Sequence, residues 1–469
     1  MAMLQSAAQE RESALSKRLA WILAVVALLC LAAAAAGVAL LASDLPLSPS
    51  PTSPLPSDTA PAPTAELPPT STPGLPAETR RSMDEIQGQV VALRGLNPLG
   101  SVERALLTSA ELRERVLDDF LSDYTPEEAA YDARMLALLG LLEPGVDLWA
   151  LYTDLLSEQV AGYYDDQAGA MFVVREAGFG GPERLTYAHE YVHALQDQHY
   201  DLDEGLGYSN EACDDDADRC AALSAMLEGD ATLLETQWLR TYATEQDFQE
   251  IQEFIATFES PVFDTAPGFL QEDLLFPYIR GIGFVTELFV EGNWAAVDEA
   301  YSRPPASTEQ ILHPGRYPDD LPILLTSPDL TPALGGDWSE LGRRVLGEWY
   351  TLLTLESFLP SETATEAAQG WGGDYVLVLT NEATGADALV LVTRWDTLID
   401  AQDSFTAFAQ YGDARFGSGS HTTTRAVWIG DGAYALLERS ADQTLWILAP
   451  DEPFAEALRQ AIPFPAAVQ

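Results

Sequence analysis

The stretch His189-Glu190-Tyr191-Val192-His193 has the pattern H-E-x-x-H, and the interpretation of the chain starts from it. Because the two histidines are four residues apart, both imidazoles leave the same face of a helix and can bind one Zn²⁺. Glu190 follows the first histidine and can accept a proton from a water molecule that the metal activates. The pattern therefore predicts a metallopeptidase centre, with His189 and His193 as ligands and Glu190 as general base.

The residues around the motif favour a helix. No Gly or Pro interrupts residues 183–204, and Leu185, Ala188, Val192 and Leu195 recur at spacings of three and four. Such spacing predicts a buried apolar stripe on an amphipathic helix. Two histidines and a glutamate on or beside a buried face are costly unless something binds them, which supports the metal site.

A catalytic zinc usually has three protein ligands, and the sequence offers two candidates for the third. His199 has the spacing of the metzincin pattern H-E-x-x-H-x-x-G-x-x-H, but Gln196 stands where that pattern needs glycine. Glu228 is favoured, within an expected long amphipathic helix. The next residue, Gly229, is unfavourable in mid-helix by about 1 kcal/mol relative to alanine. It therefore suggests that this helix closely approaches the zinc helix.

H-E-x-x-H with a downstream helical glutamate resembles the gluzincins, the thermolysin-like branch of the zincin metallopeptidases. More narrowly, the chain is similar to a little-characterised set of membrane-anchored prokaryotic proteins predicted to be metallopeptidases. The stretches that carry this likeness are Ala188-His189-Glu190, Ala194-Leu195-Gln196-Asp197-Gln198, Glu228-Gly229-Asp230-Ala231 and Ser307-Thr308-Glu309-Gln310-Ile311-Leu312-His313-Pro314. The likeness covers roughly residues 80–320.

This resemblance implies Zn²⁺ as cofactor, with His189, His193 and Glu228 as ligands and Glu190 as base. It also implies that the strand around Ala170 to Val174 is the sheet edge on which a peptide substrate docks by strand addition. The substrate-binding residues would then be Ala170, Phe172 and Val174. The chain departs from thermolysin because Glu228 lies 35 residues past His193.

Peptide hydrolysis also needs a hydrogen-bond donor for the tetrahedral oxyanion. His313 is the preferred candidate for this catalytic role, and it lies in a loop that runs from Pro304 to Pro314. Tyr163 and Tyr164 are further candidates. They belong to an expected β-hairpin over residues 162–174.

The net charge excludes one class of partner. The chain has 24 basic and 73 acidic residues, a formal net charge of −49, so nucleic acid is not an expected partner. The expected partner is instead a peptide or protein substrate.

The N-terminal region is expected to anchor the chain in a membrane. Residues 1–18 form a tail that ends in Lys17 and Arg18, and residues 19–41 follow without a charge. A helix of that length spans roughly 34 Å, enough for a bilayer, and the basic flank favours a cytoplasmic N-terminus. A cleaved signal peptide is the alternative. Residues 42–79, with eleven prolines, are expected to form an extended linker.

The remainder is expected to be α+β. Residues 80–330 read as a mostly helical zincin-like domain with a small β-sheet, including helices at 80–93, 216–258 and 277–291. Residues 340–469 read as a module with a helix at 340–358 followed by antiparallel strands and a further helix near 400–411. A boundary is expected where Pro, Gly and Asp cluster, at 326–340.

Cys213 and Cys220 form a candidate disulfide if the catalytic domain is extracytoplasmic. The hypothesis is thus a single-pass, membrane-anchored zinc metallopeptidase whose catalytic domain lies outside the cytoplasm. Two rivals remain: a degenerate zincin that binds a surface or cell-wall partner without cutting it, and a zinc hydrolase that acts on a non-peptide amide.

Overall fold

The computed structural model describes residues 75–464, except 109, 116, 118–123, 160–161, 166–167, 175–177, 331 and 431–432. The expected tail and anchor, over 1–41, lie outside the described residues, as does most of the expected linker. Within the described part of the chain, no helix is both long enough and apolar enough to cross a membrane.

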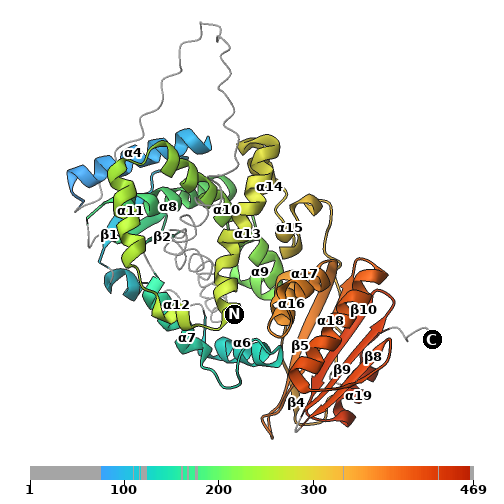
Figure 1. Cartoon of the computed structure of the whole chain (residues 1–469). Helices are drawn as coiled ribbons and strands as arrows, with labels where there is room; N and C mark the ends of the chain where they lie inside the picture. Colours follow the sequence, from blue (N-terminus) through green and yellow to red (C-terminus); the bar gives the residue numbers. More distant parts are fainter. Residues whose placement is uncertain are drawn as a thin grey trace, which may run out of the picture.

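The fold class is α+β, which confirms the prediction, and the chain has a helical part and a sheet part (Figure 1). The helical part contains α4 (Ala77–Arg94), β1 (Glu103–Leu107), α6 (Pro126–Leu138), α7 (Leu148–Gln159), β2 (Gly162–Asp165), β3 (Ala170–Val174), α8 (Gly181–Tyr200), α9 (Asn210–Asp215), α10 (Ala217–Thr241), α11 (Glu245–Thr257), α12 (Pro261–Thr265), α13 (Gly268–Gly292), α14 (Trp294–Ser302), α15 (Thr308–Leu312) and the 3-10 turn η1 (Pro314–Arg316).

The expected helix over 216–258 is two helices, α10 and α11. The break falls at residues 242–244, where the Thr244 hydroxyl accepts a hydrogen bond from the backbone N–H of Asp247. The Asp247 side chain in turn accepts from the backbone N–H of Thr244. This reciprocal capping box starts a new helix. Because Thr244 and Asp247 are polar, the spacing of apolar residues gave no sign of the break.

Gly229 allows α10 to pack closely against α13, not against α8, so the expected reason for this glycine was wrong. A Cβ at Gly229 would lie 2.2 Å from the carbonyl oxygen of Gly281 on α13, and a Cβ at Gly281 would lie 2.0 Å from the carbonyl oxygen of Ala225. The two glycines therefore let the backbones touch. This contact fixes the position of Glu228, the residue before Gly229, relative to α13.

The small sheet has the strand order β1-β3-β2. β3 pairs in parallel with β1 and antiparallel with β2, so it is the central strand. The expectation that Ala170, Phe172 and Val174 form the docking edge was therefore wrong, because both sides of their strand are already hydrogen-bonded. β1 was not anticipated, since Glu103–Leu107 lacks an alternating apolar pattern. The edge strand beside the H-E-x-x-H helix is β2.

The sheet part contains β4 (Trp338–Arg344), α16 (Gly347–Glu356), α17 (Ser361–Ala368), β5 (Trp371–Asn381), β6 (Asp387–Trp395), α18 (Leu398–Phe416), β7 (Ser420–His421), β8 (Arg425–Gly430), β9 (Ala433–Ser440), β10 (Gln443–Ala449) and α19 (Glu452–Ala461). Its strands form one seven-stranded sheet in the order β4-β5-β6-β10-β9-β8-β7, and every neighbouring pair is antiparallel. The expected helix over 340–358 is wrong in its first turns, which form β4.

Both faces of this sheet are covered. Val376 and Val378 of β5 pack in one cluster with Phe405 of α18, whereas Leu377 of the same strand packs with Leu458 of α19. Because alternate side chains of a strand point to opposite faces, a sheet covered on both sides needs a continuous apolar run. This explains why β5 and β6 read as unbroken apolar stretches.

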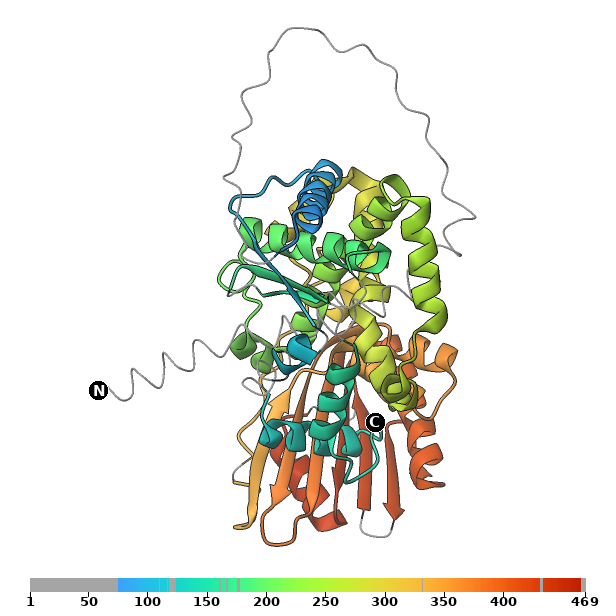
Figure 2. The ribbon, with the colours of Figure 1, turned by 90° about the vertical axis from the view of Figure 1, so that its left-hand side faces the viewer.

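The two parts share a core and a polar joint. One cluster of buried apolar side chains includes residues of α6, α10 and α13 together with α16, α18 and the large sheet. At the joint, Gly347 has φ +74°, and a Cβ there would overlap the carboxylate of Asp218 on α10. Asp374 of β5 accepts hydrogen bonds from the backbone N–H groups of Leu346 and Gly347. Figure 2 shows the helical part stacked on the ends of the long strands.

Candidate metal centre

The H-E-x-x-H motif lies in the middle of α8. The helix begins at Gly181, with Pro182 in its first turn, and Glu183 accepts a hydrogen bond from the backbone N–H of Gly180. Proline is well tolerated in the first turn because its missing N–H would have no partner there. Every residue from Leu185 to Gln196 is buried. The motif therefore sits on a central helix of the helical part.

The helix that carries Glu228 is fixed at its start. The side chain of Asp216 accepts from the backbone N–H of Arg219 and so caps α10. Cys213 of α9 and Cys220 of α10 form a disulfide, with their Cα atoms 5.4 Å apart. The cap and the disulfide both act within the first turn of α10, so they restrict how the helix leaves the preceding loop.

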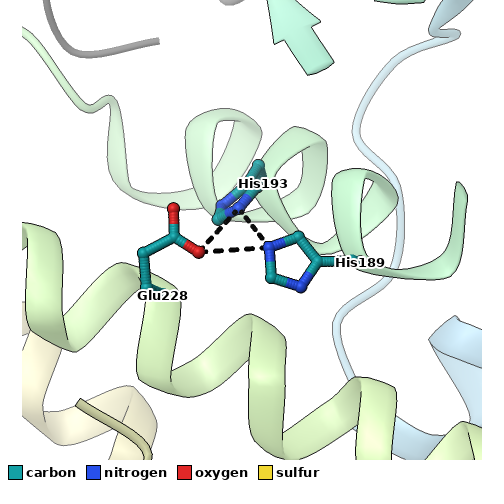
Figure 3. Close-up of side chains that lie close together, drawn as sticks. All are labelled: His189, His193 and Glu228. Carbon is teal, nitrogen blue, oxygen red and sulfur yellow. Dashed lines mark hydrogen bonds and ion pairs between the residues drawn. The ribbon is translucent and has the colours of Figure 1, made fainter. Parts of the chain in front are cut away.

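The structure brings His189, His193 and Glu228 to one point, where α8 passes α10 (Figure 3). The Nε2 atom of His189 lies 3.1 Å from Oε2 of Glu228 and 3.1 Å from Nε2 of His193. The Nε2 atom of His193 lies 3.6 Å from the same Glu228 oxygen. The three side chains are at most 1 % exposed.

Two further side chains orient the imidazoles, and the sequence analysis missed both. The Nδ1 atom of His189 lies 3.0 Å from Oε2 of Glu235, and Nδ1 of His193 lies 2.8 Å from Oε1 of Gln196. Gln196 is itself held, because its Nε2 donates to the backbone carbonyl of Leu227. Spacing could have found them: Glu235 lies two helical turns after Glu228, and Gln196 lies three residues after His193.

These contacts fit a single zinc ion. Acceptors at both Nδ1 atoms place the proton on Nδ1, so that each Nε2 lone pair faces the Glu228 carboxylate. Three lone-pair donors in contact repel one another unless a proton or a cation lies between them. Tetrahedral zinc with bonds of about 2.0–2.1 Å separates its ligand atoms by about 3.3–3.4 Å. The observed separations of 3.1–3.6 Å bracket that value.

The electrostatics of the cluster also favour a cation. Burial alone would raise the pKa of Glu228, but the two imidazoles lower it below its ordinary value. Burial alone would lower the pKa of His189, but the carboxylates of Glu228 and Glu235 raise it well above its ordinary value. The carboxylates thus attract positive charge to this buried point, which zinc would supply in place of protons.

Glu190 is fully buried beside the cluster. Its Oε2 atom accepts a hydrogen bond of 3.0 Å from the backbone N–H of Tyr164 on β2, and its Oε1 atom has no hydrogen-bond partner among the described residues. Burial raises the pKa of Glu190 to about 7, although the two histidines act to lower it. A carboxylate with one oxygen fixed and the other free is arranged to accept a proton.

The remaining candidates lie elsewhere. His199 is directed away from the cluster, and its Nε2 atom lies 2.7 Å from the backbone carbonyl of Asn97, so the metzincin alternative does not hold. The hydroxyl of Tyr164 donates to Asp197, and the hydroxyl of Tyr163 accepts from Arg115. Both tyrosine hydroxyls thus have structural partners.

His313 was expected to stabilise the oxyanion, but the structure places it at the joint between α15 and α16. Its Nε2 atom lies 2.8 Å from Oε1 of Glu348. At the start of α15, Thr308 donates to Asp218, which precedes Glu228 by ten residues, or about 15 Å along α10. The prediction for His313 is therefore corrected to a structural role.

A second group of acidic residues lies near His313. Carboxylate oxygens of Glu309, Asp320 and Asp396 lie within 4.8 Å of one another. Arg316 contacts Glu309 directly and lies 3.0 Å from Asp396 and 3.6 Å from Asp320. The guanidinium therefore supplies positive charge to this group. Among the residues that the structure describes, no lysine or arginine forms an ion pair with the carboxylates of the cluster on α8 and α10.

Comparison with known proteins reaches the sheet part alone. Residues 337–459 match a family described as a domain of unknown function (DUF8575). This stretch includes the whole seven-stranded sheet and most of α19. No curated protein and no solved structure matches the chain.

Proposed function

We propose that this protein is a zinc-dependent metallopeptidase, with His189, His193 and Glu228 as zinc ligands and Glu190 as general base. The observation that carries the proposal is the buried triangle of His189 Nε2, His193 Nε2 and Glu228 Oε2, with sides of 3.1, 3.1 and 3.6 Å. Three protein ligands leave one position of a tetrahedral zinc for water or substrate, the arrangement of catalytic sites.

The residues around the triangle have separate tasks in peptide hydrolysis. Zinc at such a site polarises the scissile carbonyl and lowers the pKa of water. Glu190 accepts a proton from that water through its free Oε1 and returns it to the leaving amine, while the N–H of Tyr164 holds Oε2 in place. Glu235 and Gln196 keep the two imidazoles in the metal-binding tautomer.

The peptide would dock along β2, residues Gly162–Asp165. β2 is an edge of the three-stranded sheet, and it packs against α8. The contact between the N–H of Tyr164 and Glu190 brings this edge directly beside the proposed base. An extended peptide that adds to β2 would run past the metal-binding triangle.

The location proposed for the catalytic part is extracytoplasmic, on an anchor formed by residues 19–41. The disulfide between Cys213 and Cys220 supports this proposal, since disulfides persist in oxidising compartments. The basic pair Lys17 and Arg18 before the apolar run favours a cytoplasmic N-terminus.

The test combines metal analysis with a peptide digest of the purified full-length chain. We expect one zinc per chain and cleavage of peptides, and we expect Glu190→Gln to retain zinc and lose cleavage. Zinc binding without cleavage of any peptide would favour a degenerate zincin that binds a surface or cell-wall partner. Cleavage limited to non-peptide amides would favour a zinc hydrolase that acts on such amides. A chain that binds no zinc, or an active Glu190→Gln variant, would refute the proposal.

A further inference from the structure

An apolar cavity of about 350 Å³ lies between the helical part and the start of the sheet part. Pockets that hold drug-sized ligands begin at about 300 Å³, so the space exceeds that of a packing defect. Its lining includes Leu136, Leu156, Ser224, Phe276, Leu346 and Tyr350, from α6, α7, α10, α13 and the sheet part.

The cavity begins one helical turn from the metal-binding triangle. Ala217, Ala221 and Ser224 line it from α10, and Glu228 continues their stripe at helical spacing. The step from Ser224 to Glu228 is about 6 Å along the helix, which a large side chain can span. Tyr208 also lines the cavity, and although burial is the main reason its pKa is raised, the nearby charge of Glu228 adds to the shift.

The chemistry of the walls favours an uncharged occupant. Of the four carboxyl groups in the lining, Asp218 accepts from Thr308, and Asp273 accepts from the indole of Trp349 and the hydroxyl of Tyr350. Burial raises the pKa of Asp218 and Asp273. The other two, Asp132 and Asp214, lie 3.9 and 3.4 Å from the guanidinium of Arg344, the basic side chain of the lining. The surface facing the space is mostly hydrocarbon and aromatic ring, so a charged side chain would lose its hydration beside charged groups that already have partners.

We propose that this cavity is the specificity pocket of the peptidase and receives a large, uncharged, apolar side chain next to the scissile bond. The inference rests on the proposed function and adds the substrate class to it. The sheet part contributes to this pocket, because Leu346 and Tyr350 belong to its lining.

The test uses blocked peptides that are identical except for one residue on either side of a common bond. That residue is Phe, Leu, Ala or Asp, and the enzyme is the zinc-loaded full-length chain. On one side of the bond we expect kcat/KM for Phe or Leu to exceed that for Ala by about tenfold or more, and Asp to be the poorest. Cleavage that ignores side-chain size and charge on both sides would overturn the inference and leave the peptidase proposal intact.

A matched pair of variants locates the pocket. Ala221→Leu adds bulk inside the cavity, and Ala256→Leu adds the same bulk at an exposed position of α11. We expect Ala221→Leu to lose most of the preference for Phe over Ala while it still cleaves the Ala peptide, and Ala256→Leu to keep the preference. Equal preference profiles for the two variants would place the pocket elsewhere and refute the assignment.

A binding measurement keeps the inference testable if Ala221→Leu does not fold. The Glu190→Gln variant with zinc is titrated with the Phe and Ala peptides in a calorimeter, and the Phe peptide should bind about tenfold more tightly. Equal affinities would count against the pocket. If the zinc-loaded wild type cleaves no peptide at all, the proposed function fails and this inference fails with it.

Discussion

The Nδ1 atom of His189 lies 3.0 Å from the Oε2 atom of Glu235, and neither side chain is more than 4 % exposed. Glu235 follows Glu228 by seven residues, so two turns of α10 supply both a metal-binding oxygen and the acceptor that orients a metal-binding imidazole. A carboxylate behind a ligating histidine fixes its tautomer and raises its basicity as a ligand. The affinity of the site should therefore depend on a residue that does not touch the metal.

Replacing Glu235 by glutamine should weaken zinc binding by about 10- to 100-fold, because an amide polarises the imidazole less than a carboxylate does. The measurement is a competition titration with a chelator of known zinc affinity. Glu245→Gln, at an exposed position on α11, is the matched control and should leave the affinity unchanged. Equal affinity in both variants would show that the contact between Glu235 and His189 does not support the site.

The sequence predicted well that His189, His193 and Glu228 lie together, and it predicted their surroundings less well, for a physical reason. His189, His193 and Glu228 belong to helices with strong periodicity, and the four-residue spacing of the histidines fixes their common face. Gln196 and Glu235 lie at helical spacing from His193 and Glu228, but the contact of Glu235 with His189 also requires that α8 and α10 cross at this point. His313 failed for the same reason, because its partner Glu348 is distant in sequence and close only in the fold.

The sheets differ in how far the sequence could predict them. Most strands of the large sheet are apolar, and the antiparallel strands expected within residues 340–469 are present. The small sheet was misassigned because β1 is short and half polar, and without β1 the strand from Ala170 to Val174 looks like an edge. A pairing between residues almost 70 positions apart leaves no local trace.

Gly229→Ala should destabilise the protein by about 1–3 kcal/mol, because the new methyl group would meet the backbone carbonyl of Gly281 at 2.2 Å and push α10 from α13. Since Glu228 is the preceding residue, zinc affinity should fall as well. Gly283→Ala is the matched control: it lies exposed on α13 with open space around it, and it should stabilise by about 0.5–1 kcal/mol. Urea unfolding checks both values, and a neutral Gly229→Ala would contradict the close contact.

Removing the disulfide with the double change Cys213→Ser and Cys220→Ser should affect the metal more than the fold. Closing so short a loop stabilises by about 2–3 kcal/mol in the chain-entropy model, a modest share for a chain of this size. The bridge holds the first turn of α10, so its loss should let Glu228 shift and lower the zinc affinity. Chelator competition and urea unfolding on the same samples separate the effects. Unchanged affinity with reduced stability would contradict this link.

Asp374 lies at the joint between the two parts, and its contribution to the free energy of unfolding should decrease as the pH rises from 4 to 7. Burial raises the pKa of Asp374 to about 6, although hydrogen bonds from Leu346, Gly347 and Trp371 act to lower it. Its ordinary value in an unfolded chain is about 3.9, so between these two values the folded state binds the proton more tightly. The resulting stabilisation is fully present below pH 4 and is lost as the pH passes 6, a change of about 3 kcal/mol.

The measurement is urea unfolding of the wild type and of Asp374→Asn at several pH values from 4 to 8. Asparagine does not titrate, so the stability of the wild type relative to the variant should fall between pH 4 and 6.5 and then stay level. The exposed Glu362→Gln variant is the control, because it shows how the free energy of unfolding changes with pH when a carboxylate in water is removed. A relative stability that rises with pH would mean that the three hydrogen bonds outweigh burial and that Asp374 anchors the cavity wall at Leu346 as a charged group.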